Sequence, residues 1–239
     1  MKRLLIVCFA FYSLVLLNGC VHFTTLDYGP LLESNPKSIL VMMPDDETND
    51  INAAPAVLAS TVLPLSERGY YVFPVSMVTD TFKHNGVNTA HEMKEIPLEK
   101  LKEVYGADAV MYLDVKKYDT KYLVLDSVTT VTVKAQLVDI NTGKILWDPI
   151  EITVNNQDGG SSDLFSKLIG AVVKHVINNV ADVGYDMAVK NAYWTYGNDI
   201  WEPTEEHFIR YNDLPRGPRS PDYRKDEVLK LYKEQHKYK

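Results

Sequence analysis

The chain has 239 residues, a length that suits one or two domains. Its hydrophobic fraction of 46% and charged fraction of 24% are those of a globular protein with a buried core. The formal net charge of -7 excludes a general nucleic-acid-binding protein, because such proteins present a strongly basic surface.

The N-terminus begins with Lys2 and Arg3, followed by an apolar run that ends at Leu17. This run is shorter than the roughly 20 residues that span a bilayer, and it has the length of a secretory signal core. The next residues complete the sequence Leu-Asn-Gly-Cys, which resembles the bacterial lipobox, with Asn18 in place of the usual Ala, Ser or Thr. The resemblance implies that residues 1–19 are a lipoprotein signal peptide and that Cys20 is lipidated.

Lipidation at Cys20 would attach the chain stably to a membrane, since each buried CH₂ group of an acyl chain contributes about 0.8 kcal/mol. Val21 stands where Asp retains enterobacterial lipoproteins in the inner membrane, so we expect an outer-membrane lipoprotein with a periplasmic domain. Cys8 lies in the signal peptide. The mature chain would therefore have no thiol left for a disulfide or a metal.

A lipidated tether is predicted over residues 20–37, which carry Gly, Pro, Ser and Asn without a sustained period. The α/β domain is predicted over residues 38–190. It opens with Ser38–Met43, a continuous apolar run that reads as a buried central strand. Helices with apolar faces and Pro or Gly boundaries are predicted at 55–69, 75–85 and 97–106, and strands at 70–74 and 107–119.

The second half of this domain has the alternation of an antiparallel meander. Residues 121–138 alternate with period two, Asn141-Thr142-Gly143 is a hairpin turn signal, and residues 144–154 return as the next strand. We therefore predict an α/β (α+β) fold, in which a βαβα half and a meander form one mixed sheet of about five to six strands covered by helices.

The C-terminal region has two predicted parts. Apolar residues from Leu164 to Val180 keep the spacing of a long helix, which either covers the sheet or serves self-association or a partner's groove. Residues 191–239 are dense in Tyr, Trp, Pro and charge. This extension either wraps over its own domain or acts as a docking arm with aromatic anchors.

No motif for catalysis, cofactor binding or metal binding is present in the sequence. No histidine pair has the HExxH spacing, and GxSxG, GxxxxGK[ST] and GxGxxG are absent. The acidic loop that starts at Asp45 fails as an EF-hand, because Asp50 stands where the loop needs Gly and Ala56 where it needs Glu. We expect a protein that is not an enzyme, without cofactor or metal, although another kind of cation site in this loop stays open.

Four blocks of sequence, found in order, carry a family resemblance. They are NPKSILVMMPDDETND, LPLSERGYYVFPV, DAVMYLDV and LDSVTTVTVKAQLVDINTGKILW, and they run from Asn35 to Trp147. The chain resembles a family of bacterial lipoproteins of unknown function, typified by a genome-derived neisserial surface-lipoprotein antigen. The stretch LPRGPRSPDY near the C-terminus is similar too.

The resemblance implies a domain like the N-terminal domain of TolB, related to the domain in the curli-secretion lipoprotein CsgG and in the synthase activator LpoB. It also implies a CsgG-like lipoprotein as a partner, and the family has no agreed catalytic residues to carry over. The best-matching positions suggest a surface or structural signature: Pro44, Glu47, Asn49, Asp126, Ser127, Thr129 and Thr130.

The leading hypothesis is a lipid-anchored, non-enzymatic accessory in the assembly or regulation of an envelope or secretion complex, with CsgG-like lipoproteins as partners and homo-oligomerisation as a further option. The alternative is a ligand- or cation-binding lipoprotein of a transport system, which would use the loop from Asp45 to Asp50.

Overall fold

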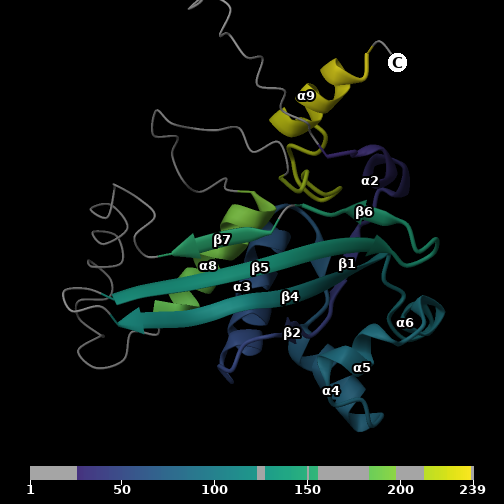
Figure 1. The fold of residues 1–239 in the computed structure, drawn as a ribbon. Helices are drawn as coiled ribbons and strands as arrows, with labels where there is room; N and C mark the ends of the chain where they lie inside the picture. The colour runs from purple at the N-terminus through teal and green to yellow at the C-terminus, as the bar shows by residue number, and fades with distance from the viewer. Residues whose placement is uncertain (1–25, 123–126, 150, 156–182, 198–212, 238–239) are drawn as a thin grey trace, which may run out of the picture.

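The computed structural model describes residues 26–122, 127–149, 151–155, 183–197 and 213–237 (Figure 1). The predicted signal peptide, Cys20, Asp126 and the predicted helix from Leu164 to Val180 lie outside these residues. The predictions that concern them therefore stay predictions.

One mixed sheet forms the centre of the domain (Figure 1). Its path is β3-β1-β4-β5-β6, with β2 beside β4 and β7 beside β5. The pairs of β1 with β3, β1 with β4, and β2 with β4 are parallel, whereas β5 is antiparallel to β4, β6 and β7. The strands are β1 (Ser38–Val41), β2 (Asp45–Asp46), β3 (Tyr71–Val72), β4 (Ala109–Tyr122), β5 (Ser127–Asp139), β6 (Ile145–Trp147) and β7 (Ile152–Asn155).

The mixed sheet, with a parallel half and an antiparallel half, confirms the predicted fold class at this level. The number of strands differs from the prediction, because the described residues form a seven-stranded sheet. The segment predicted as one strand at 144–154 forms two strands, β6 and β7, on either side of Pro149. Proline has no backbone N–H to give to a ladder, so a strand tends to end there. The other addition is β2, a two-residue strand in the loop predicted as polar.

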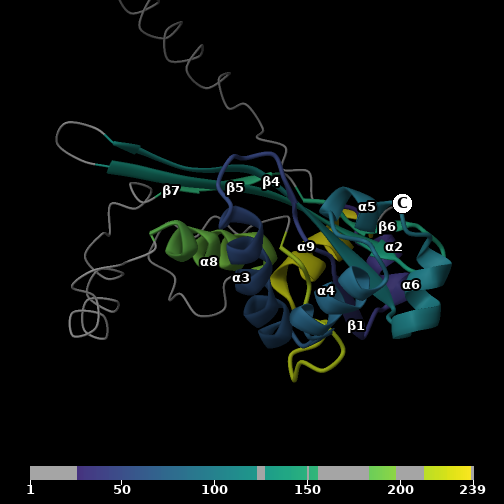
Figure 2. The ribbon, with the colours of Figure 1, turned by 90° about the horizontal axis from the view of Figure 1, so that it is seen from below.

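Helices cover both faces of the sheet. Figure 2 shows α3 and α8 together on one side, and α2 adds to the same apolar cluster. The second cluster joins α4, α5 and α6 to the opposite side of β1 and β4. The helices are α2 (Gly29–Ser34), α3 (Ala53–Glu67), α4 (Val75–His84), α5 (Ala90–Lys94), α6 (Leu98–Tyr105), α8 (Val183–Tyr196) and α9 (Glu227–Gln235).

Strand β4 divides its side chains between these two clusters. Met111 and Leu113 belong to the cluster beneath α3 and α8, whereas Val110 belongs to the cluster of α4, α5 and α6. The alternation follows from the period of two along a strand, which puts Val110 and Tyr112 of the predicted strand at 107–119 on one side and Met111 and Leu113 on the other. Apolar residues on both faces explain why helices are needed on both sides.

Residues 26–37, predicted to be part of a tether, are packed onto the domain. Tyr28 is fully buried and Leu31 is 4% exposed. Pro30 lies in the first turn of α2, where its missing N–H costs no hydrogen bond. Burial of these apolar side chains offsets the entropy lost on ordering a short segment, so the chain joins the fold well before Ser38.

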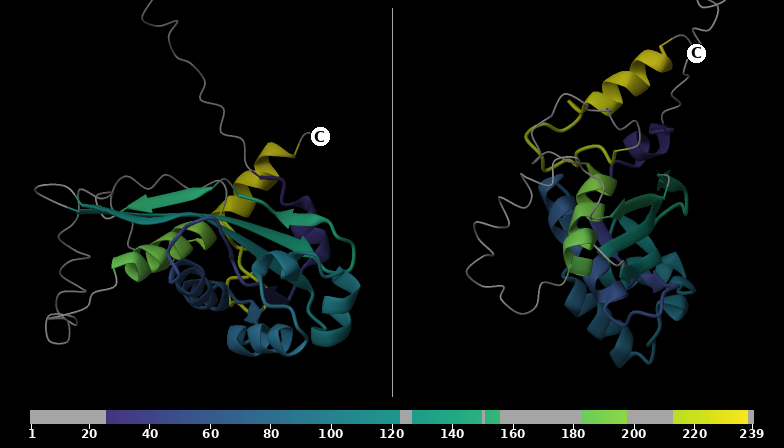
Figure 3. Two further views of the ribbon diagram at one scale, coloured as in Figure 1. Left: turned by 60° about the horizontal axis from the view of Figure 1, so that its bottom comes forward. Right: turned by 60° about the vertical axis from the view of Figure 1, so that its left-hand side comes forward.

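The C-terminal region is also integrated into the fold. Helix α8 runs through the boundary predicted between residues 190 and 191, and it packs against α3 and β5. Residues 213–237 return to the N-terminal end of the domain, where α9 lies beside α2 (Figure 3). The described part of the C-terminal region therefore lies over its own domain. In the part of the chain that the structure describes, no helix is both long enough and apolar enough to cross a membrane.

Candidate functional site

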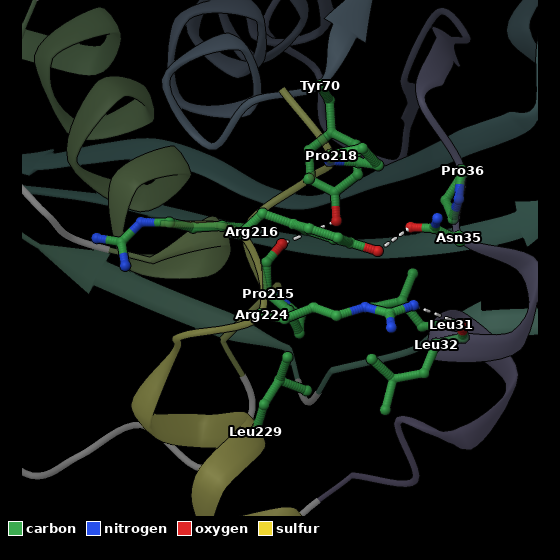
Figure 4. Close-up of a pocket in the computed structure, with 12 residues that line it drawn as sticks. Leu31, Leu32, Asn35, Pro36, Tyr70, Pro215, Arg216, Pro218, Arg224 and Leu229 are labelled. Atoms are coloured by element: carbon green, nitrogen blue, oxygen red, sulfur yellow. Dashed lines mark hydrogen bonds between the residues drawn. The ribbon is translucent and has the colours of Figure 1, made fainter. Parts of the chain in front are cut away.

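Residues 213–237, named here the C-terminal clasp, bind the end of α3 and the start of β3. The Gly217 N–H donates to the carbonyl oxygen of Arg68 at 2.7 Å, and the Arg219 N–H donates to that of Gly69 at 3.1 Å. The Tyr70 hydroxyl donates to the carbonyl oxygen of Pro215 at 2.8 Å (Figure 4). These backbone contacts hold the clasp in one register on the domain.

The clasp also carries the acidic partners of the buried Arg68. The Arg68 Nη1 lies 3.4 Å from Asp226 Oδ1, and Nη2 lies 3.5 Å from Asp213 Oδ2. Burial raises the pKa of the Asp226 carboxyl, while a hydrogen bond from the Arg216 N–H and the two neighbouring guanidinium groups favour the carboxylate. This cluster joins α3 to the clasp, and its charged groups form ion pairs with one another inside the fold.

A cavity lies between α2 and the clasp, lined by residues such as Leu31, Tyr70, Pro215 and Leu229 (Figure 4). Its volume is about 20 Å³, and a single water needs roughly 10–15 Å³ measured in this way. A cavity of this size holds about one water molecule. The contact between α2 and the clasp is therefore a packing interface and has no room for a ligand.

A larger open groove of about 550 Å³ lies beside β4. One wall is the loop that follows β2, from Thr48 to Ile51, and the other is the strand from Lys116 to Thr120. In Figure 2 the loop between β2 and α3 rises next to this part of the sheet. Because it is open and wide, this groove is the candidate functional site among the described residues.

The groove exists because β2 is short and β4 is long. Strand β2 pairs with β4 only at Asp114 and Val115, and the last bond of this ladder runs from the Glu47 N–H to the Val115 carbonyl oxygen at 3.0 Å. The chain then turns away through the loop, whereas β4 continues to Tyr122. A bulge between Val115 and Lys117 shifts the register at this point.

The register shows which groups of β4 face the groove. On β5, Asp139 donates its N–H to Lys144 on the β6 side, so the odd-numbered residues of β5 face away from β4 and the even-numbered ones face it. Lys117 and Asp119 pair with the even-numbered Thr132 and Thr130. By alternation, the backbone N–H and C=O of Thr120 point to the other edge of β4, toward the groove.

The charges that line the groove largely cancel one another. Lys116 forms an ion pair with Glu47, and Lys117 Nζ lies 3.8 Å from Asp119 Oδ1. The Asp50 carboxylate accepts the Asn52 N–H at 2.9 Å. The most exposed large apolar side chain of the described residues, Ile51 at 89% exposure, stands in the same wall. The site is therefore suited to a neutral ligand with both polar and apolar groups.

The predicted signature residues fall around this end of the sheet, in different environments. Asn49 lines the groove, and Glu47 pairs with Lys116 at its edge. Thr129 is buried and its hydroxyl bonds that of Thr120 at 2.9 Å, so it supports the strand from within. The other described signature residues are Pro44, buried after β1, Thr130, paired with Asp119, and Ser127, paired with Tyr122.

The acidic loop engages its carboxylates within the protein. Asp45 Oδ2 lies 3.0 Å from Lys94 Nζ, which also pairs with Asp114. Asp46 accepts the Thr48 N–H at 2.8 Å. Within the described ranges, no group of three or more His, Cys, Asp or Glu side chains is placed to hold a metal ion. The cation-binding alternative stays a prediction, and the carboxylates that would serve it have these other partners.

Comparison with known proteins places the chain in a family. The family model described as "Putative lipoprotein GNA1162-like" matches residues 26–197, which is more than half of the chain. The chain belongs to this family. A relative from Neisseria meningitidis serogroup B, named "Putative lipoprotein NMB1124/NMB1162", is 45% identical over 193 residues, which are 81% of this chain and 85% of the relative. The predicted resemblance is thereby confirmed.

Two solved structures illustrate the range of similarity. The crystal structure of lipoprotein GNA1162 from Neisseria meningitidis is 46% identical, covers 60% of this chain and 100% of its own, and aligns with a TM-score of 0.48. The PelC dodecamer from Paraburkholderia phytofirmans is 15% identical, covers 51% of this chain and 71% of its own, and aligns with a TM-score of 0.34. Membership of the lipoprotein family implies a location in the bacterial cell envelope.

Proposed function

We propose that this protein is a non-enzymatic outer-membrane lipoprotein, anchored through Cys20, whose periplasmic domain helps to assemble or regulate an envelope or secretion complex. Its family is one of lipoproteins, and the lipobox-like sequence ends at Cys20. CsgG-like lipoproteins are the proposed partners, and the TolB-like relationship of the domain belongs to the same proposal.

The observation that carries the proposal is the position of the groove relative to residues 26–37, which follow the proposed anchor in the sequence. Residues 26–37 lie at the end of the sheet where β4 begins, since Asp108 accepts the Lys37 N–H at 2.9 Å. The groove lies beside Thr120, and eleven residues of strand from Ala109 correspond to roughly 35 Å. A domain anchored at one end would thus present its open groove at the other, directed away from the membrane.

The anchor is tested by the variant Cys20→Ala, followed by membrane fractionation and mass determination. We expect the variant to leave the membrane fraction and to lack the mass of the acyl chains. The variant Cys8→Ala is the matched control, because that residue lies in the predicted signal peptide, and it should behave as the wild type. A Cys20→Ala protein that stays with the membrane would refute the anchor.

The accessory role is tested by affinity purification from crosslinked membranes. We expect recovery of an envelope lipoprotein, with CsgG-like proteins as the first candidates. Purification of the protein alone, as a monomer in gentle detergent, would count against an assembly role. A screen of metals, sugars and lipids by thermal shift then addresses the transport alternative, which predicts a stabilising ligand.

A further inference from the structure

We propose that the groove edge of β4, from Lys117 to Thr120, is a docking site for one extended segment of a partner protein, which adds to the sheet as a strand where β2 ends. This inference rests on the proposed function for the identity of the partner, and it specifies the mode of binding. The same edge of β4 already carries β2 in a parallel ladder at Asp114 and Val115.

The backbone geometry gives the first argument. Thr120 directs its N–H and C=O toward the groove, as its register on β5 requires. A sheet edge binds an extended chain mainly through such main-chain groups. A bound strand would lie about 4.8 Å from β4, in the space that the loop leaves beside it.

The lining of the groove gives the second argument. Two basic side chains, Lys116 and Lys117, are matched by acidic ones within the same wall or beside it. Recognition by charge is therefore weak, and main-chain pairing has the larger share. Asp119 Oδ1, which faces the Lys117 ammonium at 3.8 Å, is buried and makes no hydrogen bond within the described residues.

The exposed Ile51 indicates the side chains of the segment. At 89% exposure it buries almost none of its apolar surface within the described structure. An aliphatic side chain of the bound segment would cover Ile51, and burial of apolar surface is the main favourable contribution to such contacts. We therefore infer a segment with an aliphatic residue among polar ones.

The size of the groove favours a single segment from another protein over a second copy of this chain. The stretch from Lys117 to Thr120 is about 13 Å long at the rise of a strand. A second copy that offered the same edge would bring its own Thr48–Ile51 loop against the first copy's loop, which forms one wall of the groove. Among the described residues, a lone extended chain meets no such obstacle.

The test uses the full lipidated chain in nanodiscs and a phage-displayed library of random decapeptides as the probe. We expect selected peptides to bind Ile51→Lys with an affinity lower by about tenfold or more. The reason is that loss of one buried aliphatic contact typically reduces affinity by this factor. Val104→Lys is the matched control, because Val104 is 60% exposed on α6, away from the groove, and its affinity should equal that of the wild type.

A second measurement leaves the protein unchanged and alters the peptide. In a bound strand, alternate amide N–H groups point toward β4 and away from it. N-methylation of the first set removes the hydrogen bonds to β4, whereas N-methylation of the second set leaves them intact. We expect one set of N-methyl positions to reduce affinity about tenfold or more and the other set to have little effect. The Thr120 amide should also gain protection from hydrogen exchange on binding.

Several results would overturn the proposal. They are binding that is insensitive to Ile51→Lys, equal effects of both sets of N-methyl positions, or a library that yields no binder. Self-association that Ile51→Lys abolishes would show that the occupant is a second copy. This test is independent of the test of the anchor. If the Cys20→Ala variant remained in the membrane fraction, the proposed anchor would fail, and peptide binding at β4 could still be observed.

Discussion

Arg68 and Asp226 meet across 158 residues of sequence, with 3.4 Å between the guanidinium and carboxylate atoms. Their side chains are only 6% and 4% exposed. Arg68 follows α3 and Asp226 precedes α9, so this ion pair closes the C-terminal clasp onto the α/β domain. Each charge depends on the other, because an isolated charge in a buried position is costly.

The variant Asp226→Ala should lower the free energy of unfolding by about 3–5 kcal/mol, since it leaves the Arg68 guanidinium buried with less compensation. Urea unfolding measures the change. Asp222→Ala is the control, because Asp222 and its partner Lys225 are 54% and 67% exposed, and such pairs contribute about 1 kcal/mol or less. Equal losses in the two variants would show that the buried pair has no special role.

Gly197 accommodates the Arg68 side chain, so Gly197→Ala should be strongly destabilising. An added Cβ would lie 1.2 Å from Arg68 Nη2, and the backbone φ is +116°. We expect a loss of about 3 kcal/mol or more, because the buried guanidinium must move away from its carboxylates. The control is Gly86→Ala, at φ +82° with nothing within 4 Å, where about 1 kcal/mol is expected. Thermal unfolding of both variants tests whether the difference is present.

Asp139 makes stability sensitive to acid. Burial alone would raise the pKa of its carboxyl, but hydrogen bonds from the Ser34 and Thr142 hydroxyls and from two backbone N–H groups outweigh burial and lower it below 3.8. A lowered pKa in the folded state means that the carboxylate stabilises the protein above pH 3.8, and that this stabilisation is lost as the pH falls through the lowered pKa.

The variant Asp139→Asn should therefore be less stable than the wild type at neutral pH, by about 1.5–3 kcal/mol for lost hydrogen bonds to a charged group. The difference should shrink as the pH falls below 3.8. Urea unfolding at several pH values measures both quantities, with the exposed Asp222→Asn as the control. A difference that is the same at every pH would contradict the proposed titration.

Removal of residues 213–239 should release α2 from the domain. Tyr28 loses its hydrogen bond to the Asp213 carbonyl oxygen, at 2.8 Å, and its edge contact with the Tyr232 ring. Limited proteolysis with chymotrypsin should then cleave after Tyr28 in the truncated protein and spare this bond in the full chain. A chain that lacks only residues 238–239 is the control, and cleavage at the same rate in all three would show that the clasp does not hold α2.

Several elements could be predicted because their signals are local. The period of two placed Val110 and Met111 on opposite faces of β4, as the two apolar clusters confirm. Helix α5 also had a local signal that the prediction missed, the capping box of Thr89 and Glu92. Helix α8 was harder, because its buried stripe includes small and polar residues such as Asn191 and Thr195, which an apolar pattern does not detect.

The candidate site could be predicted only in part. Glu47 and Asn49 were named from the family resemblance, and they do lie at the groove. Nothing local indicated that β2 would end after two residues while β4 continued, because that outcome depends on pairing between segments about 70 residues apart. The pairing of Arg68 with Asp226 is hidden for the same reason, since long-range contacts leave no period in the sequence.

The clasp also determines how far the domain can stand from its anchor. If Cys20 carries the acyl chains, the six residues to Leu26 span at most about 20 Å, whereas release of residues 26–36 would extend this to roughly 55 Å. The Tyr232 hydroxyl, which donates to Asp27 at 2.7 Å, and the buried Tyr28 hold the shorter state. The C-terminal residues of this protein thus set the length of the segment that joins the domain to its proposed anchor. A partner that competes for them would change the distance between the groove and the membrane.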